Sequence, residues 1–442
     1  MEKNKDQAVI MSENNNNNKA QDPNPRFASE GCSVLLDVND GDRLVFARLS
    51  GGAVLKIGNK NYSLKPLIGA PFGSLFQVET GEDGSFLSRI LPVKKESSSN
   101  NVIDDARDNR ELIDNNEAQN LTGEEIEAMR REGAKGDEII EALIANSKTF
   151  DQKFQLSQEK YKLKKQKKYA PKLLLRRPFA RSICEAYFKK YPNRIGFLRV
   201  DALSLLLTMA NVTAYSDVLV VDMVGGLVTG AVAERLGGTG YVCNTYKGNS
   251  PPSVEMVRMF NFTDKVIERI VQSSINELSS AKTVSPEENN HQEGVHPSTS
   301  DMVEGTPVTA EARVVVDDVV LESKIVKAPK AGAKASKEAI EMWKENGFSS
   351  LIMAAQDQDP WALAKDVLPL LSYSAPFAIY HQYLQPLATC MHNLQQGKMA
   401  INLQITEPWL REYQVLPSRT HPHMQMSSFG GYVLSGIRIS TT

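Results

Sequence analysis

The stretch VLVVDMVGGLVTGAVAERLGG, residues 218–238, constrains the fold more than any other part of this sequence. It joins an apolar run, a pair of glycines and a second apolar pattern, which is the order of a buried strand, a tight turn and a helix. Further apolar runs, VLVV, YVCN, LIMAA and FAIYH, alternate with helical stretches. Strands that are apolar on both faces and alternate with helices predict a doubly wound, mostly parallel α/β domain.

The turn in this stretch departs from a nucleotide-binding turn. Such turns space glycines as G-x-G-x-G, because a Cβ would obstruct the approach of the ligand. With Gly226 in the middle, the outer positions fall on Val224 and Val228, whose β-branched side chains resist a positive φ and fill the cleft. After the next run, YVCNTY, the carboxylate that would accept ribose hydroxyls is replaced by Lys247, which has donors only. We therefore expect a degenerate site that binds no cofactor, the alternative being an active site with unusual residues.

The rest of the chain divides by composition. Its 442 residues are enough for two or three domains. Short apolar runs separated by turn signals from Cys32 to Val78 predict a small β-domain, and Thr122 with Glu125 forms the capping box of a first helix. The predicted segments are a disordered terminus over 1–28, a β-barrel-like domain over 29–93, a flexible insert over 94–120, a helical basic connector over 121–194, and a Rossmann-like domain over 195–442 with a low-complexity insert at about 271–337.

Positive charge is concentrated in the segment SQEKYKLKKQKKYAPKLLLRRPFAR, residues 157–181, which contains no acidic residue from Lys160 onward. Such a run is found on solvated helix faces, in nuclear import signals and in RNA-binding segments. Tyr161 and Tyr169 interleave with the lysines and are suited to stacking, and the arginines continue beyond a compact import signal, which favours RNA. The predicted RNA-binding residues here are Lys160, Lys162, Lys164, Lys165, Lys167, Lys168, Arg176 and Arg177.

Other chemistries are not indicated. The four cysteines are far apart, so neither a zinc cluster nor a disulfide framework is predicted, and a reducing compartment, cytosol or nucleus, is expected. His421 and His423 have no further ligand at a suitable spacing for a metal. The net charge of -2 excludes a chain that is basic over its whole surface. No apolar run reaches the ~18 residues of a membrane span.

Four separated motifs, in the same order along the chain, together resemble one family. They are SQEKYKLKKQKK, DMVGGLVTGAVAERLGG, PSRTHPHMQM and FGGYVLSGIRI. From about Cys32 to Ile439, apart from the two low-complexity inserts, the chain resembles the non-catalytic subunits of the eukaryotic tRNA (adenine(58)-N(1))-methyltransferase.

This resemblance implies an assembly of two catalytic and two non-catalytic subunits. Each subunit has an N-terminal β-domain and a C-terminal Rossmann-like methyltransferase domain, and S-adenosylmethionine occupies the catalytic subunit alone. The non-catalytic subunit helps to hold tRNA so that an adenine of the T-loop reaches its partner's site. We therefore expect a tRNA-binding subunit in the nucleus with no catalytic residue. The alternatives are a methyltransferase that is active alone and an RNA-binding scaffold without an enzyme partner.

The resemblance also bears on particular residues. Arg419 and His421 lie in the family's PSRTHPHM motif, and Arg419 either contacts tRNA or pairs at a subunit interface. An acidic residue of the catalytic paralogue falls near Gln356, while Asp359 and the Pro after it also fit a turn that starts a helix. The family's Rossmann-like domains pack through the end of the sheet that contains GGYVLSGIRI, so removing 429–439 is expected to prevent co-purification with the catalytic subunit.

Overall fold

The computed structural model of the chain describes two domains and a helical module. The described residues are 24–81, 84–91, 119–151, 153, 155–280, 330–415, 420–424 and 429–440. Most of the expected disordered terminus, of the flexible insert and of the low-complexity insert lies outside them. In the described part, no helix is long and apolar enough to cross a membrane.

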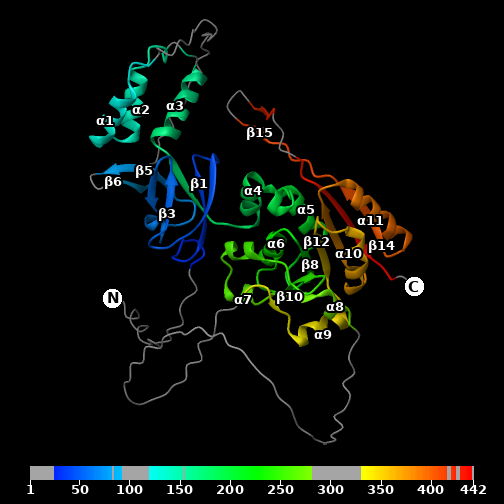
Figure 1. The fold of residues 1–442 in the computed structure, drawn as a ribbon. Helices are drawn as coiled ribbons and strands as arrows, with labels where there is room; N and C mark the ends of the chain where they lie inside the picture. The colour runs from blue at the N-terminus through cyan, green and yellow to red at the C-terminus, as the bar shows by residue number, and fades with distance from the viewer. Residues whose placement is uncertain are drawn as a thin grey trace, which may run out of the picture.

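The N-terminal domain is a five-stranded antiparallel sheet (Figure 1). In the order β2-β1-β7-β5-β6, its strands are β2 (Arg43–Arg48), β1 (Ser33–Val38), β7 (Lys172–Arg176), β5 (Leu75–Gly81) and β6 (Gly84–Ile90). A separate hairpin, β3 (Val54–Ile57) and β4 (Lys60–Ser63), is followed by the short helix η1 (Lys65–Leu67). Leu55 and Tyr62 of the hairpin share one core with the sheet, so the predicted β-domain is present.

The strand β7 corrects the prediction of a wholly helical connector over 121–194. It lies in the middle of the N-terminal sheet, between β1 and β5. Leu173 and Leu175 alternate with Leu174 and are fully buried in the core of that domain. The sequence KLLLR is an apolar run without visible alternation, so its period does not distinguish a strand from a helix. The segment forms a strand because it pairs with β1 on one side and with β5 on the other.

The helical module lies between β6 and β7 in the chain, so strands of the N-terminal domain precede and follow it. Its helices are α1 (Gly123–Arg131), α2 (Gly136–Ala145) and α3 (Gln155–Tyr169). The predicted capping box is confirmed, because Thr122 Oγ1 accepts from the Glu125 amide and the Glu125 carboxylate accepts from the Thr122 amide. A small core that includes Ile139 and Leu143 joins α1 and α2 and contacts Tyr169 of α3. The module projects from the N-terminal sheet (Figure 1).

The C-terminal domain is the predicted doubly wound α/β fold, with an eight-stranded sheet in the described residues. In the order β11-β10-β9-β8-β12-β13-β17-β14, the strands are β11 (Ala333–Lys334), β10 (Ile270–Ser274), β9 (Tyr241–Tyr246), β8 (Asp217–Asp222), β12 (Ser350–Ala354), β13 (Pro376–His381), β17 (Tyr432–Arg438) and β14 (Ala400–Thr406). The strands from β11 to β13 are parallel, whereas β17 runs antiparallel to β13 and β14.

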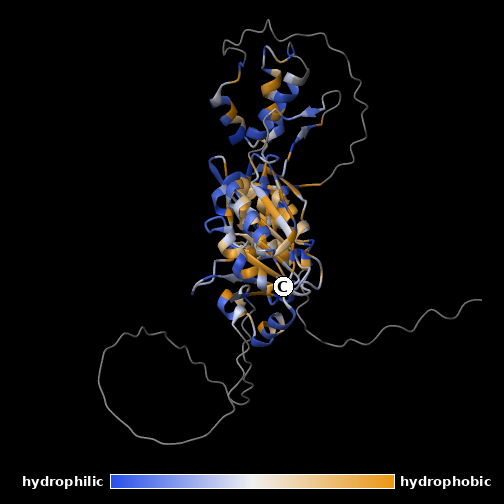
Figure 2. Cartoon of the chain, turned by 90° about the vertical axis from the view of Figure 1, so that its right-hand side faces the viewer, coloured by the Kyte–Doolittle hydropathy of each residue, from blue (hydrophilic) through white to orange (hydrophobic). Residues whose placement is uncertain are grey.

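Helices cover both faces of this sheet, which explains the unbroken apolar strands. Val218 and Val220 of β8 belong to one core cluster and Leu219 and Val221 to the other. Hydrophobic colour accordingly lies along strands at the centre of the molecule, with hydrophilic colour around them (Figure 2). The first cluster packs under α4 (Ala180–Lys190), α5 (Val200–Met209) and α6 (Leu227–Leu236), and the second under α8 (Ile275–Ser279), α9 (Lys337–Asn346), α10 (Pro360–Val367) and α11 (Leu384–Gln396).

The predicted insert at about 271–337 begins too early. Residues 270–280 form β10 and α8, both part of the α/β domain. The polar letters of IVQSS hid this strand, since Gln272 and Ser273 are buried. Their side chains are hydrogen-bonded, because Gln272 Nε2 donates to the Pro252 carbonyl at 3.0 Å and the Ser273 hydroxyl donates to Glu277 Oε2 at 3.1 Å. Within this insert, the run ARVVVDDVVLESKIV at 312–326 also predicts a short helical or extended piece, and it lies outside the described residues.

The last strand, β17, is not at the end of the sheet. It pairs with β13 on one side and with β14 on the other, and Val433 and Leu434 are buried. Removing 429–439 would therefore split the sheet, and the expected loss of co-purification would not locate a subunit interface. The edge of the sheet on this side is β14.

The two domains are joined by a pair of hydrogen bonds. Asn261, in the left-handed region at φ 54°, accepts from the Ser33 amide at 2.7 Å and donates through Nδ2 to the Ser33 carbonyl at 2.8 Å. Both bonds come from one side-chain amide, so they fix its orientation on β1. The N-terminal sheet is thereby tied to the α/β domain.

Because β7 is central to the N-terminal sheet, Leu175→Ala should lower the free energy of unfolding of that domain by about 2–5 kcal/mol. The control is Leu163→Ala in α3, where the side chain is 56% exposed and the change should stay within about 0.5 kcal/mol. Hydrogen exchange of the β1 and β5 amides measures both variants. Equal protection of those amides in Leu175→Ala and the native chain would contradict the central position of β7.

Candidate nucleic-acid interface and altered cofactor crevice

The crevice where open α/β sheets bind ligands lies outside the carboxyl ends of β8 and β12. From β8 the chain proceeds through β9 to β10 in one direction, and β12 leads to β13 in the other. Ligands bind where the strand order reverses in this way. The glycine turn after β8 lies at this point and leads into α6.

The glycine turn keeps the backbone of a nucleotide-binding turn. Gly225 and Gly226 have φ of 76° and 88°, which side chains rarely adopt. The buried Asp222 carboxylate accepts from the amides of Val224 and Gly226 at 2.9 and 3.2 Å, and from the Thr229 amide and hydroxyl at 2.8 and 2.9 Å. Burial raises the pKa of Asp222, and these hydrogen bonds oppose the rise. The amides that would meet a ligand's anionic group are thus used by the protein itself.

The backbone of Val254 and the side chain of Met256 pack against the two glycines. A Cβ on Gly226 would lie 2.7 Å from Val254 Cα, and one on Gly225 would lie 2.9 Å from Met256 Cε. The Met256 amide also donates to the Gly225 carbonyl at 3.1 Å. Residues 254–256 therefore pack directly against the glycine turn, and neither glycine has room for a side chain.

The predicted obstruction of the crevice by Val224 and Val228 is wrong. Both side chains are fully buried and belong to the core cluster under α6. They do not occupy the cleft, and the backbone at Val224 does not have positive φ. The sequence identified the altered turn through these residues but missed Val254 and Met256. Neither carries a local signal, because their position above the turn depends on the path of the chain after β9.

Lys247 follows β9 directly and forms an ion pair across the crevice. Its Nζ lies 2.9 Å from Asp366 Oδ2 in α10. The Asp366 carboxylate near the end of β9 therefore accepts a hydrogen bond from Lys247. The pair is partly exposed, so it contributes little stability.

The residues after β12 are structural. Asp359 caps α10, since its carboxylate oxygens accept from the amides of Trp361 and Ala362 at 3.4 and 3.1 Å. Pro360 is the first helical residue, as the turn interpretation predicted. A Cβ on Gly196 would lie 2.5 Å from Gln356 Oε1, so the Gln356 amide packs against the loop before α5. Asp357 is exposed.

The predicted lysine run lies on a single helix, α3. Lys160, Lys162, Lys164, Lys167 and Lys168 are exposed and Lys165 is partly buried. Of these, Lys167 is paired with Asp42 of the β1–β2 turn at 2.7 Å. The run therefore presents cations to solvent along most of its length.

The two tyrosines of α3 are engaged within the protein. Tyr161 lies edge-on to Phe150, with ring centroids 5.7 Å apart, and burial raises the pKa of its hydroxyl. The Arg130 guanidinium lies 5.3 Å from the centroid of Tyr169, which contacts the small core of the module. Their predicted role as stacking platforms is therefore replaced by a packing role, because the rings hold α3 to the rest of the module.

The predicted arginines have different surroundings. Arg176, at the end of β7, is 3.2 Å from Asp37 Oδ2 and is therefore paired. Arg177 is exposed and lines a hollow between the two domains. Arg419 lies outside the described residues. His421 contacts Gln414 in a small hairpin, β15 (Tyr413–Gln414) and β16 (His421–Pro422). In the described part of the chain, no cluster of three His, Cys, Asp or Glu residues is arranged for a metal.

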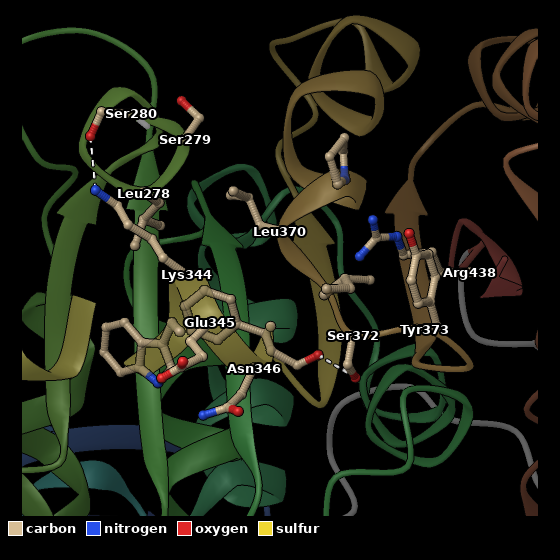
Figure 3. Close-up of a pocket in the computed structure, with 15 residues that line it drawn as sticks. Leu278, Ser279, Ser280, Lys344, Glu345, Asn346, Leu370, Ser372, Tyr373 and Arg438 are labelled. Carbon is tan, nitrogen blue, oxygen red and sulfur yellow. Dashed lines mark hydrogen bonds between the residues drawn. The ribbon is translucent and has the colours of Figure 1, made fainter. Parts of the chain in front are cut away.

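Another cavity lies near the amino ends of β12 and β13, on the other side of the domain from the crevice. It occupies about 720 Å³ between the ends of α8 and α9 and the residues before β13 (Figure 3). Lys344 on one side donates to Ser280 Oγ at 2.9 Å, and Arg438 on the other lies 4.8 Å from the centroid of Tyr373. Two helices end here, and their carbonyls oppose anion binding. This cavity is therefore no substitute for the crevice.

Comparison with known proteins identifies the family. The model of the Gcd10p family matches residues 28–305. A tRNA (adenine(58)-N(1))-methyltransferase non-catalytic subunit of Dictyostelium discoideum is 33% identical over 93% of this chain and 79% of its own length. The protein of the same name from Mus musculus is 29% identical over 91% of this chain and 88% of its own.

Among solved structures, a SAM-dependent O-methyltransferase of Thermotoga maritima is 11% identical, with a TM-score of 0.48 over 94% of this chain and 96% of that one. A tRNA (m1A58) methyltransferase of Aquifex aeolicus is 12% identical, with a TM-score of 0.43 over 94% and 99%. The assignment depends on the sequence matches, which extend over both domains. The chain belongs to the Gcd10p family, whose curated relatives are the non-catalytic subunits of tRNA (adenine(58)-N(1))-methyltransferase.

Proposed function

We propose that this chain is the tRNA-holding, non-catalytic subunit of a nuclear tRNA (adenine(58)-N(1))-methyltransferase. Two copies would assemble with two catalytic subunits, which alone bind S-adenosylmethionine. The observation that carries this proposal is the glycine turn covered by Val254 and Met256. A methyltransferase that acts alone would need that space for its donor.

The nuclear location is supported by the exposed lysines of α3, because lysine runs serve as nuclear import signals. The distribution of a fluorescent fusion of the chain between nucleus and cytoplasm tests it.

The reaction needs a subunit that grips RNA. An adenine in the folded elbow of tRNA must leave its stack before its ring nitrogen can react, and the surrounding RNA has to be held meanwhile. Lysine contacts to phosphate position the RNA without reading its sequence. The exposed lysines of α3 lie on a module that projects from the N-terminal sheet (Figure 1), which supports a role in holding tRNA.

The catalytic partner would dock at the β14 edge of the large sheet. This edge strand carries Ile401, which is 53% exposed. Beyond β14, Trp409 and Val415 are 74% and 75% exposed, and Met424 is 94% exposed. Large apolar side chains are thus exposed both at the sheet edge and along the segment that follows it, and exposed apolar surface marks protein interfaces. The segment with β15 extends away from the sheet (Figure 1), so a partner can contact it from more than one side.

Titration of S-adenosylmethionine by calorimetry tests the proposal. The chain alone should give no binding heat, because residues 254–256 cover the glycine turn. The complex with the catalytic subunit should bind one donor per catalytic subunit. Stoichiometric binding to the isolated chain would show that it retains a donor site and would contradict the proposal.

The RNA role of α3 is tested by neutralising Lys160, Lys162 and Lys164 with Gln in the complete complex. Each phosphate contact contributes about 0.7 to 0.9 to the slope of log affinity against log salt, so the slope should become shallower by about 2. The control removes three exposed charges from the α/β domain, as Arg235→Gln, Lys265→Gln and Lys337→Gln, and should leave the slope unchanged. Equal slopes for the α3 variant and the native complex would argue against tRNA contact by α3.

The partner surface is tested by the double variant Trp409→Ala and Val415→Ser. It should reduce co-purification with the catalytic subunit by at least about tenfold, since losing buried aromatic and apolar contacts at an interface costs more than about 1.4 kcal/mol. The control Tyr215→Ala removes another exposed aromatic ring, 84% exposed, from the same domain. Light scattering of the native complex should give the mass of two plus two subunits. Full recovery of the double variant in the complex would place the interface elsewhere.

A further inference from the structure

A groove between the N-terminal sheet and the helical module forms a second candidate site. Its volume is about 570 Å³. One wall is the β1–β2 turn with the β3–β4 hairpin, and the other is α1, the start of α2 and the last residues of α3. We propose that this groove binds the phosphodiester backbone of a single RNA strand, an inference that rests on the proposed role in tRNA binding.

The groove has an excess of positive charge. Five basic side chains line it against two acidic ones, Asp42 and Glu127. One acid is already neutralised, because Lys167 Nζ lies 2.7 Å from Asp42 Oδ1. The remaining basic residues are Arg43, Lys60, Arg130 and Lys168. A concave surface with one sign of charge concentrates the opposite charge more strongly than a flat one.

Three of these cations keep donors for a ligand. Arg43 Nη1 donates to the Lys56 carbonyl at 2.6 Å. Arg130 and Lys168 both lie over the ring of Tyr169, at 5.3 and 5.1 Å from its centroid. Among the described residues, none of the three forms an ion pair with a carboxylate. Guanidinium groups held in this way match phosphate oxygens in geometry and charge.

The groove suits phosphates better than bases. The Tyr169 ring is covered by cations, and Tyr62 is only 5% exposed, so neither ring offers an open face for stacking. The volume is that of a small-molecule pocket, which accommodates one strand and not a duplex. Lys167 and Lys168 belong both to the groove and to the end of α3. The groove therefore continues the lysine face and extends the path of an RNA backbone to the N-terminal sheet.

The test uses the complete complex with Arg43→Gln, Arg130→Gln and Lys168→Gln combined. Its ligands are unmodified tRNA and single-stranded oligouridylate and oligoadenylate of about 12 nucleotides. The salt slope for both oligonucleotides should become shallower by about 2, because three phosphate contacts to a single strand are lost. The slope for tRNA should fall in the same direction. The control is the variant with Arg235, Lys265 and Lys337 replaced by Gln, whose slopes should equal those of the native complex.

Conservative replacement separates charge from packing. Arg43→Lys with Arg130→Lys keeps both charges and should retain the native slope. If this variant loses as much slope as the Gln variant, the arginines act through packing and the proposal is overturned. A loss confined to one oligonucleotide means base recognition and also overturns it.

The α3 variant distinguishes this proposal from the proposed function. Native slopes in the groove variant, together with a shallower slope in the α3 variant, reject the groove and leave the tRNA-holding role in place. Native slopes in both variants reject the two together.

Discussion

The return of the chain to the N-terminal sheet at β7 determines where the basic residues lie. Because β7 pairs with both β1 and β5, the helices α1 to α3, which lie between β6 and β7 in the chain, are connected at both ends to strands of this sheet. The lysines of the helical module therefore lie on a helix, α3, that leads directly into the central strand β7. The same anchoring brings the end of α3 against the β1–β2 turn, where Lys167 pairs with Asp42. The groove between module and sheet is a consequence of this connection.

The glycine turn of the α/β domain is held in place by the protein's own groups. Gly225 and Gly226 retain their left-handed backbone, and Asp222 retains four hydrogen bonds that hold the turn. Val254 packs against Gly226, where a Cβ would lie 2.7 Å from Val254 Cα. Such a domain remains a folded support for binding surfaces elsewhere. This agrees with a family whose relatives are non-catalytic subunits.

Sequence reasoning was reliable where a signal is local. The capping box at Thr122 and the parallel strands around VLVVD were each predicted from adjacent residues, and the structure confirms them. It was wrong where the assignment depends on a distant neighbour. The run KLLLR forms a strand because it pairs with β1 on one side and β5 on the other. The strand β10 could not be recognised from its composition, because its buried polar residues Gln272 and Ser273 have hydrogen-bond partners outside the strand.

The sequence by itself determined the fold class, the concentration of lysines over α3 and the departure from a cofactor turn, since period, charge and residue type are properties of short segments. Tertiary structure alone decided that Val224 and Val228 are core residues, that Val254 covers the turn, and that β17 is an interior strand. It also decided which cations gather with Arg43 and Arg130. These features depend on contacts between residues far apart in the chain, and such contacts are settled by packing, which no local pattern encodes.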